Sequence, residues 1–157
     1  MNARVTIALD AMGGDRAPGM VIKGARLARQ RHPHADFVLF GDERKLRPLL
    51  DKAPKLKSFC ALRHTDEAIT DDVKPSVALR SGRQSSMRLA IDAVHDGSAA
   101  GVVSAGNTGA LMALAKFVLR TLPGIDRPAI ASYFPTERGE TVMLDLGANV
   151  EDRKSVV

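Results

Sequence analysis

Small polar residues and glycines follow an apolar run near the middle of this chain. Residues 99–103 are apolar, and a long apolar stretch at helical spacing begins beyond position 109. The turn between them contains Ser104, Gly106, Asn107, Thr108 and Gly109. Strand, glycine-rich turn and helix in this order aim backbone N–H groups and the positive end of a helix dipole at an anion such as phosphate. An ordinary Asn or Thr helix cap explains the same residues equally well.

A second turn of this kind follows the β-prone run 5–9. It reads Asp10-Ala11-Met12-Gly13-Gly14-Asp15. Its glycines would let the backbone approach a ligand, and its two aspartates would position donors or a substrate. A tight turn with an Asp cap is the alternative. The turn is not G-x-G-x-x-G, and no Gly-Lys-Ser/Thr loop occurs, so the pattern does not favour a nucleotide site.

Two further positions could add polar groups to the same region. Ser85 and Ser86 open a helix marked by Met87, Ala90, Ile91 and Val94, and they are either caps or hydrogen-bond donors. Asp145 and Asn149 close the last strand-like run, where they are either ligands or parts of a turn.

Other catalytic chemistry has little support in the sequence. Cys60 lies in an apolar run, which is typical of a small core residue, and the four histidines fall at helix ends or in loops. No spacing of residues suits a metal. Phosphate as a nucleophile needs neither a cysteine, a metal nor a histidine base, because it is already ionised near neutral pH.

The elements that must position these residues alternate along the chain. We expect strands at 5–9, 37–40, 59–62, 99–103, 129–134 and 141–146. We expect helices at 18–31, from 43 with an early end at Pro48, from 85 to 95, and after 109, with an acidic surface loop at 64–75. This alternation predicts an α/β fold with a mostly parallel sheet covered on both faces. Ligands of such sheets bind beyond the carboxyl ends of the strands.

Composition restricts the possible partners. The 157 residues fit one domain, no apolar run could span a bilayer, and no secretory signal precedes the first strand. One cysteine excludes an internal disulfide and favours the reducing cytoplasm. The net charge of +5 favours an acidic or anionic partner. One Tyr and no Trp argue against nucleic acid, because single-strand binders stack bases on aromatic side chains.

Several blocks of the sequence, taken in order, resemble the phosphate acyltransferase family. They are residues 7–15, 41–42, 85–87, 104–112, 124–129 and 144–149. The resemblance implies a three-layer α/β/α fold similar to the isocitrate/isopropylmalate dehydrogenase type. It also implies a cytoplasmic homodimer, peripherally associated with the membrane, that moves a fatty acyl group from acyl carrier protein to inorganic phosphate. The product would be acyl phosphate for phospholipid synthesis, formed without a cofactor or a metal.

Within that resemblance, the mechanistic hypothesis assigns roles to the turns. Amides at the start of the helix after 109 hold phosphate, Asn107 and Thr108 orient it, and Ser85 and Ser86 stabilise the oxyanion. Asn107, Ser86 and Asp10 are the candidate catalytic residues, with Asp10 shaping the site rather than transferring a proton. The remaining site residues shape the site or bind substrate. They are Gly13, Gly14, Asp15, Arg16, Ser104, Gly106, Gly109, Asp145 and Asn149. Arg16 stands where the family usually has His; it cannot transfer a proton as His does, but it can bind phosphate.

The family pattern stops after Asn149, whereas family members continue through a second half. We therefore expect residues 1–150 to be the N-terminal part of a phosphate acyltransferase domain and 151–157 to be a tail outside the family pattern. Two alternatives stay open: a phosphate-binding or dimerising fragment without turnover, and an acyltransferase that uses acyl-CoA.

Overall fold

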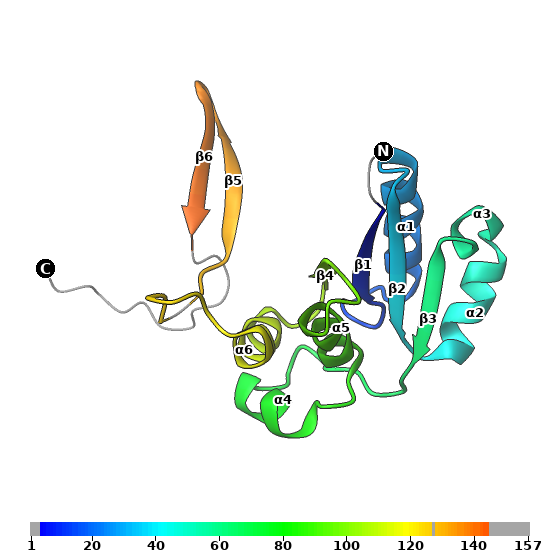
Figure 1. Ribbon diagram of the computed structural model, residues 1–157, viewed down its shortest axis with the longest axis horizontal. Coiled ribbons are helices and arrows are strands. Elements are labelled where there is room, and N and C mark those ends of the chain that lie inside the picture. The colour runs from blue at the N-terminus through cyan, green and yellow to red at the C-terminus, as the bar shows by residue number, and fades with distance from the viewer. Residues whose placement is uncertain (1–3, 127, 145–157) are drawn as a thin grey trace, which may run out of the picture.

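The computed structural model describes residues 4–126 and 128–144 as an α/β fold (Figure 1). Its strands are β1 (Val5–Asp10), β2 (Ala35–Gly41), β3 (Cys60–His64), β4 (Gly101–Val103), β5 (Ala131–Thr136) and β6 (Gly139–Leu144). Its helices are α1 (Gly19–Arg31), α2 (Glu43–Asp51), α3 (Pro54–Lys57), α4 (Pro75–Ser81), α5 (Ser86–His95) and α6 (Thr108–Leu119). The predicted alternation of strands and helices is confirmed from β1 to α6.

The main sheet has four parallel strands in the order β3-β2-β1-β4. β1 lies between β2 and β4, so the chain crosses from one edge of the sheet to the other after β3. Because the strands are parallel, the turns that follow β1, β2 and β4 all lie at one edge of the sheet. This topology brings the two glycine-rich turns together.

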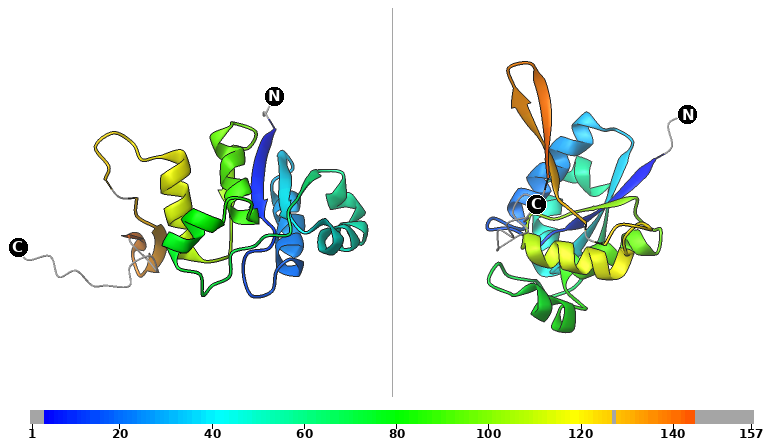
Figure 2. Two further views of the ribbon diagram at one scale, coloured as in Figure 1. Left: turned by 90° about the horizontal axis from the view of Figure 1, so that it is seen from below. Right: turned by 90° about the vertical axis from the view of Figure 1, so that its left-hand side faces the viewer.

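Helices cover both faces of the sheet (Figure 2). On one face, Leu9 and Leu39 pack in a core cluster with Ile22 of α1 and Leu46 of α2. On the other face, Ala8 packs in a cluster with residues of α5, such as Ala90. Helix α6 packs against α5, and α4 packs against α6, so both helices extend this second layer. The predicted three-layer α/β/α class with a parallel sheet is therefore confirmed.

The length of helix α2 contradicts one prediction from the sequence. Pro48 was expected to kink or end this helix early, but α2 continues through it to Asp51. Leu46 and Leu50 lie on either side of the proline and are both buried, 0% and 4% exposed. Packing of these two leucines on the core holds the helix together across the missing N–H group.

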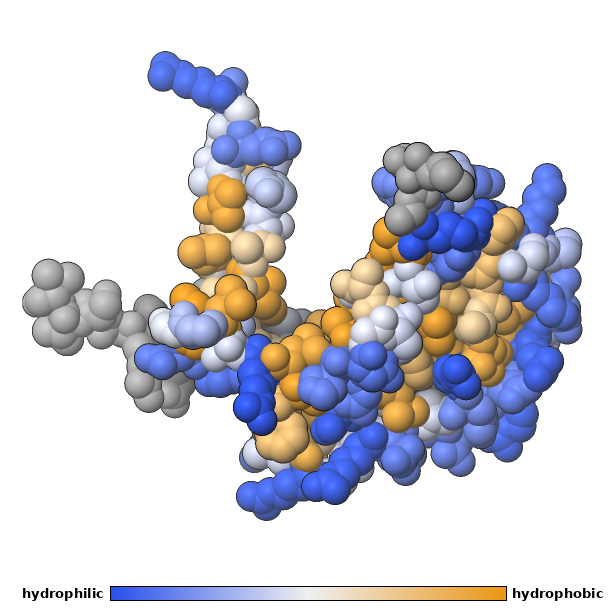
Figure 3. Space-filling model, in the orientation of Figure 1, coloured by the Kyte–Doolittle hydropathy of each residue, from blue (hydrophilic) through white to orange (hydrophobic). Residues whose placement is uncertain are grey.

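The last two strands form a separate sheet. β5 and β6 pair with each other as an antiparallel hairpin and do not extend the parallel sheet. Only two residues, Glu137 and Arg138, connect them, whereas a parallel neighbour requires a crossover of about a dozen residues or more. The hairpin stands away from the sheet, with apolar residues gathered toward its base and polar residues at its tip (Figures 1 and 3).

Candidate functional site

Asp10 is the centre of a hydrogen-bonded cluster at the carboxyl ends of β1 and β4. Its side chain is buried, with 3% of the residue exposed. Ser86 Oγ donates to Asp10 Oδ1 over 2.6 Å, and Ser104 Oγ donates to Asp10 Oδ2 over 2.7 Å. The N–H of Met12 also donates to Oδ1, over 3.3 Å. One carboxyl group thus joins the end of β1, the first turn of α5 and the turn after β4.

Gly13 and Gly106 bring the two glycine-rich turns into direct contact. A Cβ at Gly13 would lie 2.5 Å from Asp10 Oδ2, 2.9 Å from Ser104 Oγ and 2.9 Å from the nitrogen of Gly106. A Cβ at Gly106 would lie 3.2 Å from the Cα of Gly13. The N–H of Gly106 in turn donates to Ser104 Oγ over 3.1 Å. Gly13 and Gly106 thus let one turn approach the other, and their predicted approach to a ligand stays a prediction.

Ser85 and Ser86 have separate roles at the start of α5. Ser85 is the N-cap: its Oγ accepts the N–H of Arg88 over 3.2 Å and donates to the carbonyl of Gly82 over 2.7 Å. Ser86 is the first helical residue and donates to Asp10. The cap interpretation is thus correct for Ser85, whereas Ser86 belongs to the Asp10 cluster.

Thr65 is a positioning residue that sequence reasoning missed. It lies in the loop expected to be an acidic surface, yet it is 7% exposed. Its hydroxyl donates to the carbonyl of Gln84, and the N–H of Glu67 donates to that hydroxyl over 3.2 Å. The carbonyl of Glu67 then accepts the N–H of Ser86 over 2.9 Å. The only signal in the sequence was a threonine among charged residues, which does not distinguish a buried contact from an exposed one.

Asn107 caps α6 and holds the acidic loop. Its Oδ1 accepts the N–H of Ala110 over 3.0 Å. Its Nδ2 donates to three loop carbonyls: Val73 at 2.9 Å, Asp71 at 3.0 Å and Thr70 at 3.3 Å. The Asn cap interpretation is confirmed. Both ends of the amide are occupied by protein groups, so its predicted contact with phosphate stays a prediction.

A groove of about 620 Å³ opens at the start of α6. The turn at 105–109, Asp15 and residues 71–75 line it. Within the described ranges, the backbone N–H groups of Thr108 and Gly109 donate to no protein acceptor. They therefore present the partial positive charge of the α6 N-terminus to the groove.

The charges around this groove are mixed. Lys74 lines it together with three aspartates, Asp15, Asp71 and Asp72. A hydrogen bond from the hydroxyl of Thr70 lowers the pKa of Asp72, so this carboxyl is ionised at neutral pH. An anion bound here would rely on the amides and Lys74, and the carboxylates would restrict where it sits.

The remaining predicted site residues are dispersed. Gly14 adopts φ +93°, which favours glycine, and packs against Ala105. Arg16 is exposed in the turn before α1. Asp145 and Asn149 lie outside the described residues. The structure thus joins Asp10, Gly13, Ser86, Ser104 and Gly106 in one cluster, and Gly106 links that cluster to the groove.

Cys60 and the metal-ligating residue types form no second site. Burial raises the pKa of the Cys60 thiol to about 11, with a further contribution from the negative charge of Asp36. Throughout residues 4–126 and 128–144, no three His, Cys, Asp or Glu side chains gather as metal ligands would. Nor is any helix in these ranges long and apolar enough to cross a membrane.

Comparison with known proteins connects this geometry to one family. The model of the fatty acid synthesis protein family matches residues 5–156. Three proteins named phosphate acyltransferase are 69%, 60% and 60% identical over 151 residues; they come from Rhodospirillum centenum, Paramagnetospirillum magneticum and Rhodospirillum rubrum. The match covers 96% of this chain and 42–43% of theirs, so the chain spans less than half the length of these relatives. The chain belongs to the fatty acid synthesis protein family of the phosphate acyltransferases, and corresponds to the N-terminal part of its members.

Proposed function

We propose that this chain is the phosphate-binding part of an acyltransferase that moves a fatty acyl group from acyl carrier protein to inorganic phosphate. The observation that carries the proposal is the 69% identity to a phosphate acyltransferase over a region that contains both glycine-rich turns. Acyl carrier protein as the donor, a homodimer and peripheral attachment to the membrane are finer parts of the proposal. They rest on the family resemblance and on the net charge of +5, which suits acidic partners.

The groove at the start of α6 supplies groups that suit phosphate. The free N–H groups of Thr108 and Gly109 would donate to phosphate oxygens, as helix N-termini do at many anion sites. The Thr108 hydroxyl and the Lys74 ammonium would add a donor and a positive charge. Asn107 would act by fixing the turn and the loop at 70–73, since its own amide is occupied.

The reaction needs little from the protein beyond positioning. A phosphate oxygen attacks the carbonyl carbon of the acyl thioester, a C–O bond forms, and the C–S bond breaks. The carrier leaves as a thiolate, which takes a proton from water. Since phosphate is already ionised, no protein base is required. The protein would hold the two reactants in line and stabilise the oxyanion that develops on the carbonyl oxygen.

The Asp10 cluster supports this positioning role. Ser86 and Ser104 each direct a hydroxyl to Asp10, which keeps the two turns and the start of α5 in one arrangement. The direct catalytic roles predicted for Asp10, Ser86 and Asn107 remain predictions, because these groups are engaged with one another or with the backbone. For Ser86 to donate to an oxyanion, its hydroxyl would have to leave Asp10.

Two measurements test the proposal. Equilibrium dialysis with labelled inorganic phosphate measures binding to the chain, and Lys74→Ala should weaken it roughly fivefold because one charge–charge contact is lost. Lys55→Ala, which removes an exposed lysine far from the groove, is the matched control and should change nothing. Equal affinity in all three proteins would place phosphate elsewhere.

The second measurement identifies the acyl donor. The chain is incubated with phosphate and either acyl carrier protein thioester or acyl-CoA, and acyl phosphate is trapped with hydroxylamine. Product from the carrier thioester supports the proposal, and product from acyl-CoA alone overturns the assigned donor. Phosphate binding without product from either thioester would identify the chain as a phosphate-binding part without turnover of its own.

A further inference from the structure

A second groove, of about 300 Å³, runs along α6 and is lined mainly by apolar residues. Thr108, the first residue of the helix, lines both this groove and the phosphate groove. From Thr108 the lining follows α6 through Met112 and Ala115 to Leu119, and residues 128–130 also line it. The two grooves therefore share the start of α6.

The residues of α6 that line this groove form one stripe of the helix. They stand at positions 108, 111, 112, 115, 116 and 119, which is the spacing of a single helical face. Ala110 and Leu114 lie on the other side of α6, where they are fully buried and pack in a cluster with Met87 and Ile91 of α5. Helix α6 is thus apolar on two sides because one side packs on α5 and the other lines the groove.

Lys116 ties the segment after α6 to the helix. Its ammonium donates to the carbonyl of Asp126 over 2.7 Å, just before the residues at 128–130 that line the groove. With its charged head held there, the methylene stem of Lys116 is left to line the groove. The groove is therefore formed between two segments of this chain and is more than an exposed helix face.

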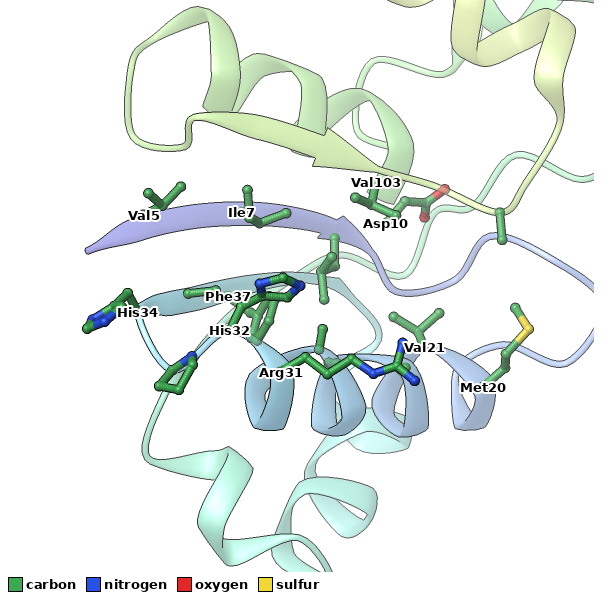
Figure 4. A pocket seen from close by; sticks show the side chains of 17 residues that line it. Val5, Ile7, Asp10, Met20, Val21, Arg31, His32, His34, Phe37 and Val103 are labelled. Carbon is green, nitrogen blue, oxygen red and sulfur yellow. The ribbon is translucent and has the colours of Figure 1, made fainter. Parts of the chain in front are cut away.

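A larger apolar groove, of about 840 Å³, lies beside α1 and is lined by Val5 of β1 and Val103 of β4 (Figure 4). It reaches the turn after β4 at Ala105, but its lining includes neither Thr108 nor Gly109. The N–H groups of these two residues face the phosphate groove. Of the two apolar grooves, the one along α6 is therefore the one that starts at the proposed phosphate donors.

We infer that the groove along α6 holds the hydrocarbon chain of a long-chain acyl group, with the acyl carbonyl carbon beside Thr108. The inference rests on the proposed function, because phosphate held at the start of α6 has to reach that carbon. Helix α6 has 12 residues and is about 18 Å long. An extended alkyl chain of roughly fifteen carbons has a similar length. Such a chain would remove the half-buried side chains of Met112 and Ala115 from water.

Binding of monoalkyl phosphates tests the inference. Octyl phosphate and tetradecyl phosphate carry a phosphate head on a short and a long chain, and neither has a reactive carbonyl. Each is titrated into the chain below its micelle concentration, and the dissociation constant is measured by calorimetry. Tetradecyl phosphate should bind at least about thirtyfold more tightly, because its additional methylene groups leave water.

Leu119→Gln removes an apolar side chain at the end of the groove that lies farthest from Thr108. It should weaken binding of tetradecyl phosphate roughly fivefold and leave octyl phosphate within about twofold, because the shorter chain does not reach Leu119. Leu122→Gln is the matched control. Leu122 is 76% exposed and lies outside the groove lining, so this variant should leave both affinities unchanged.

Equal affinity for the two chain lengths, or equal weakening by both variants, would overturn the inference. So would self-association of the chain that Leu119→Gln abolishes and tetradecyl phosphate does not displace, because a second copy would then occupy the groove. Dialysis with inorganic phosphate separates this inference from the proposed function. Phosphate binding without a dependence on chain length overturns only the acyl-chain groove. A dependence on chain length without binding of inorganic phosphate overturns only the proposed phosphate site.

Discussion

Asp10 accepts a hydrogen bond from the hydroxyl of Ser104 over 2.7 Å, although 94 residues separate them in the sequence. The contact is possible because β1 and β4 are neighbours in the sheet, with Leu9 paired to Val103. The same carboxyl accepts Ser86 from a third segment. Each residue is ordinary by itself, and the cluster exists only through the strand order.

Asp10→Ala should destabilise the chain by about 2 kcal/mol or more, because two hydroxyls and one N–H lose their acceptor in a buried setting. Urea unfolding followed by circular dichroism measures the loss. Asp15→Ala removes an exposed aspartate from the same turn and should change stability by less than about 0.5 kcal/mol. Similar effects of the two variants would mean that the Asp10 cluster does not hold the turns together.

Gly13→Ala should destabilise the fold by about 1–3 kcal/mol and weaken phosphate binding, because the added methyl group would overlap Asp10 and the Gly106 turn. Gly19→Ala adds the same methyl group where nothing lies within 4 Å, and it should be neutral or stabilising by up to about 1 kcal/mol. Thermal unfolding and phosphate dialysis of both variants make the comparison. A stable Gly13→Ala variant with normal phosphate affinity would contradict the close approach.

Asn107→Asp separates the two contacts of Asn107. Aspartate still caps α6 but cannot donate to the carbonyls at 70–73, so amide hydrogen exchange should rise in the loop and stay low at the start of α6. Asn107→Ala removes both contacts, should increase exchange in both segments and should cost about 1 kcal/mol for the cap alone. If Asn107→Asp leaves exchange in the loop unchanged, the amide does not restrain it.

Cys60 should react slowly in the folded chain. Burial raises the pKa of the Cys60 thiol to about 11, so the folded chain holds little thiolate at pH 8. In the unfolded chain the thiol has a pKa of about 8.5, so much more of it is thiolate at this pH. Alkylation by iodoacetamide at pH 8 should therefore be roughly one hundred times slower in the native chain than in urea. Mass spectrometry follows the rate. Equal rates in the two states would show that burial does not protect the thiol.

Asp36 should contribute to stability in a pH-dependent way. The hydrogen bond and ion pair with Arg4 lower the pKa of Asp36 in the folded chain. The stability that this carboxylate contributes is therefore fully present above its ordinary pKa of about 3.9. It is lost as the pH falls through the lowered pKa of the folded chain. Asp36→Asn should therefore reduce the unfolding temperature at pH 7 and converge with the unsubstituted chain in strong acid. Adding Arg4→Ala to Asp36→Asn should cost little more, as expected for two partners of one contact. A deficit that is constant with pH would exclude this linkage.

Much of the fold was predictable because its signals are local. The runs at 5–9 and 37–40, the helix between them and the caps at Ser85 and Asn107 depend on residues a few positions apart. Pro48 was misinterpreted because its effect on α2 depends on leucines that pack against a distant core. The last two strands were expected correctly as strands, but their antiparallel pairing follows from the short turn between them.

The sequence by itself determined the element types, the turns that carry glycine and polar residues, and the family that these blocks resemble. Only the tertiary structure decided that Asp10, Ser86 and Ser104 meet, that Asn107 holds the loop at 70–73, and that Thr65 is buried. It also decided that one side of α6 lines an apolar groove that begins at Thr108. The physical reason is the sequence separation of the residues that interact. Helix caps and hydrophobic periodicity depend on residues a few positions apart. Strand order and burial depend on packing between segments that lie far apart along the chain.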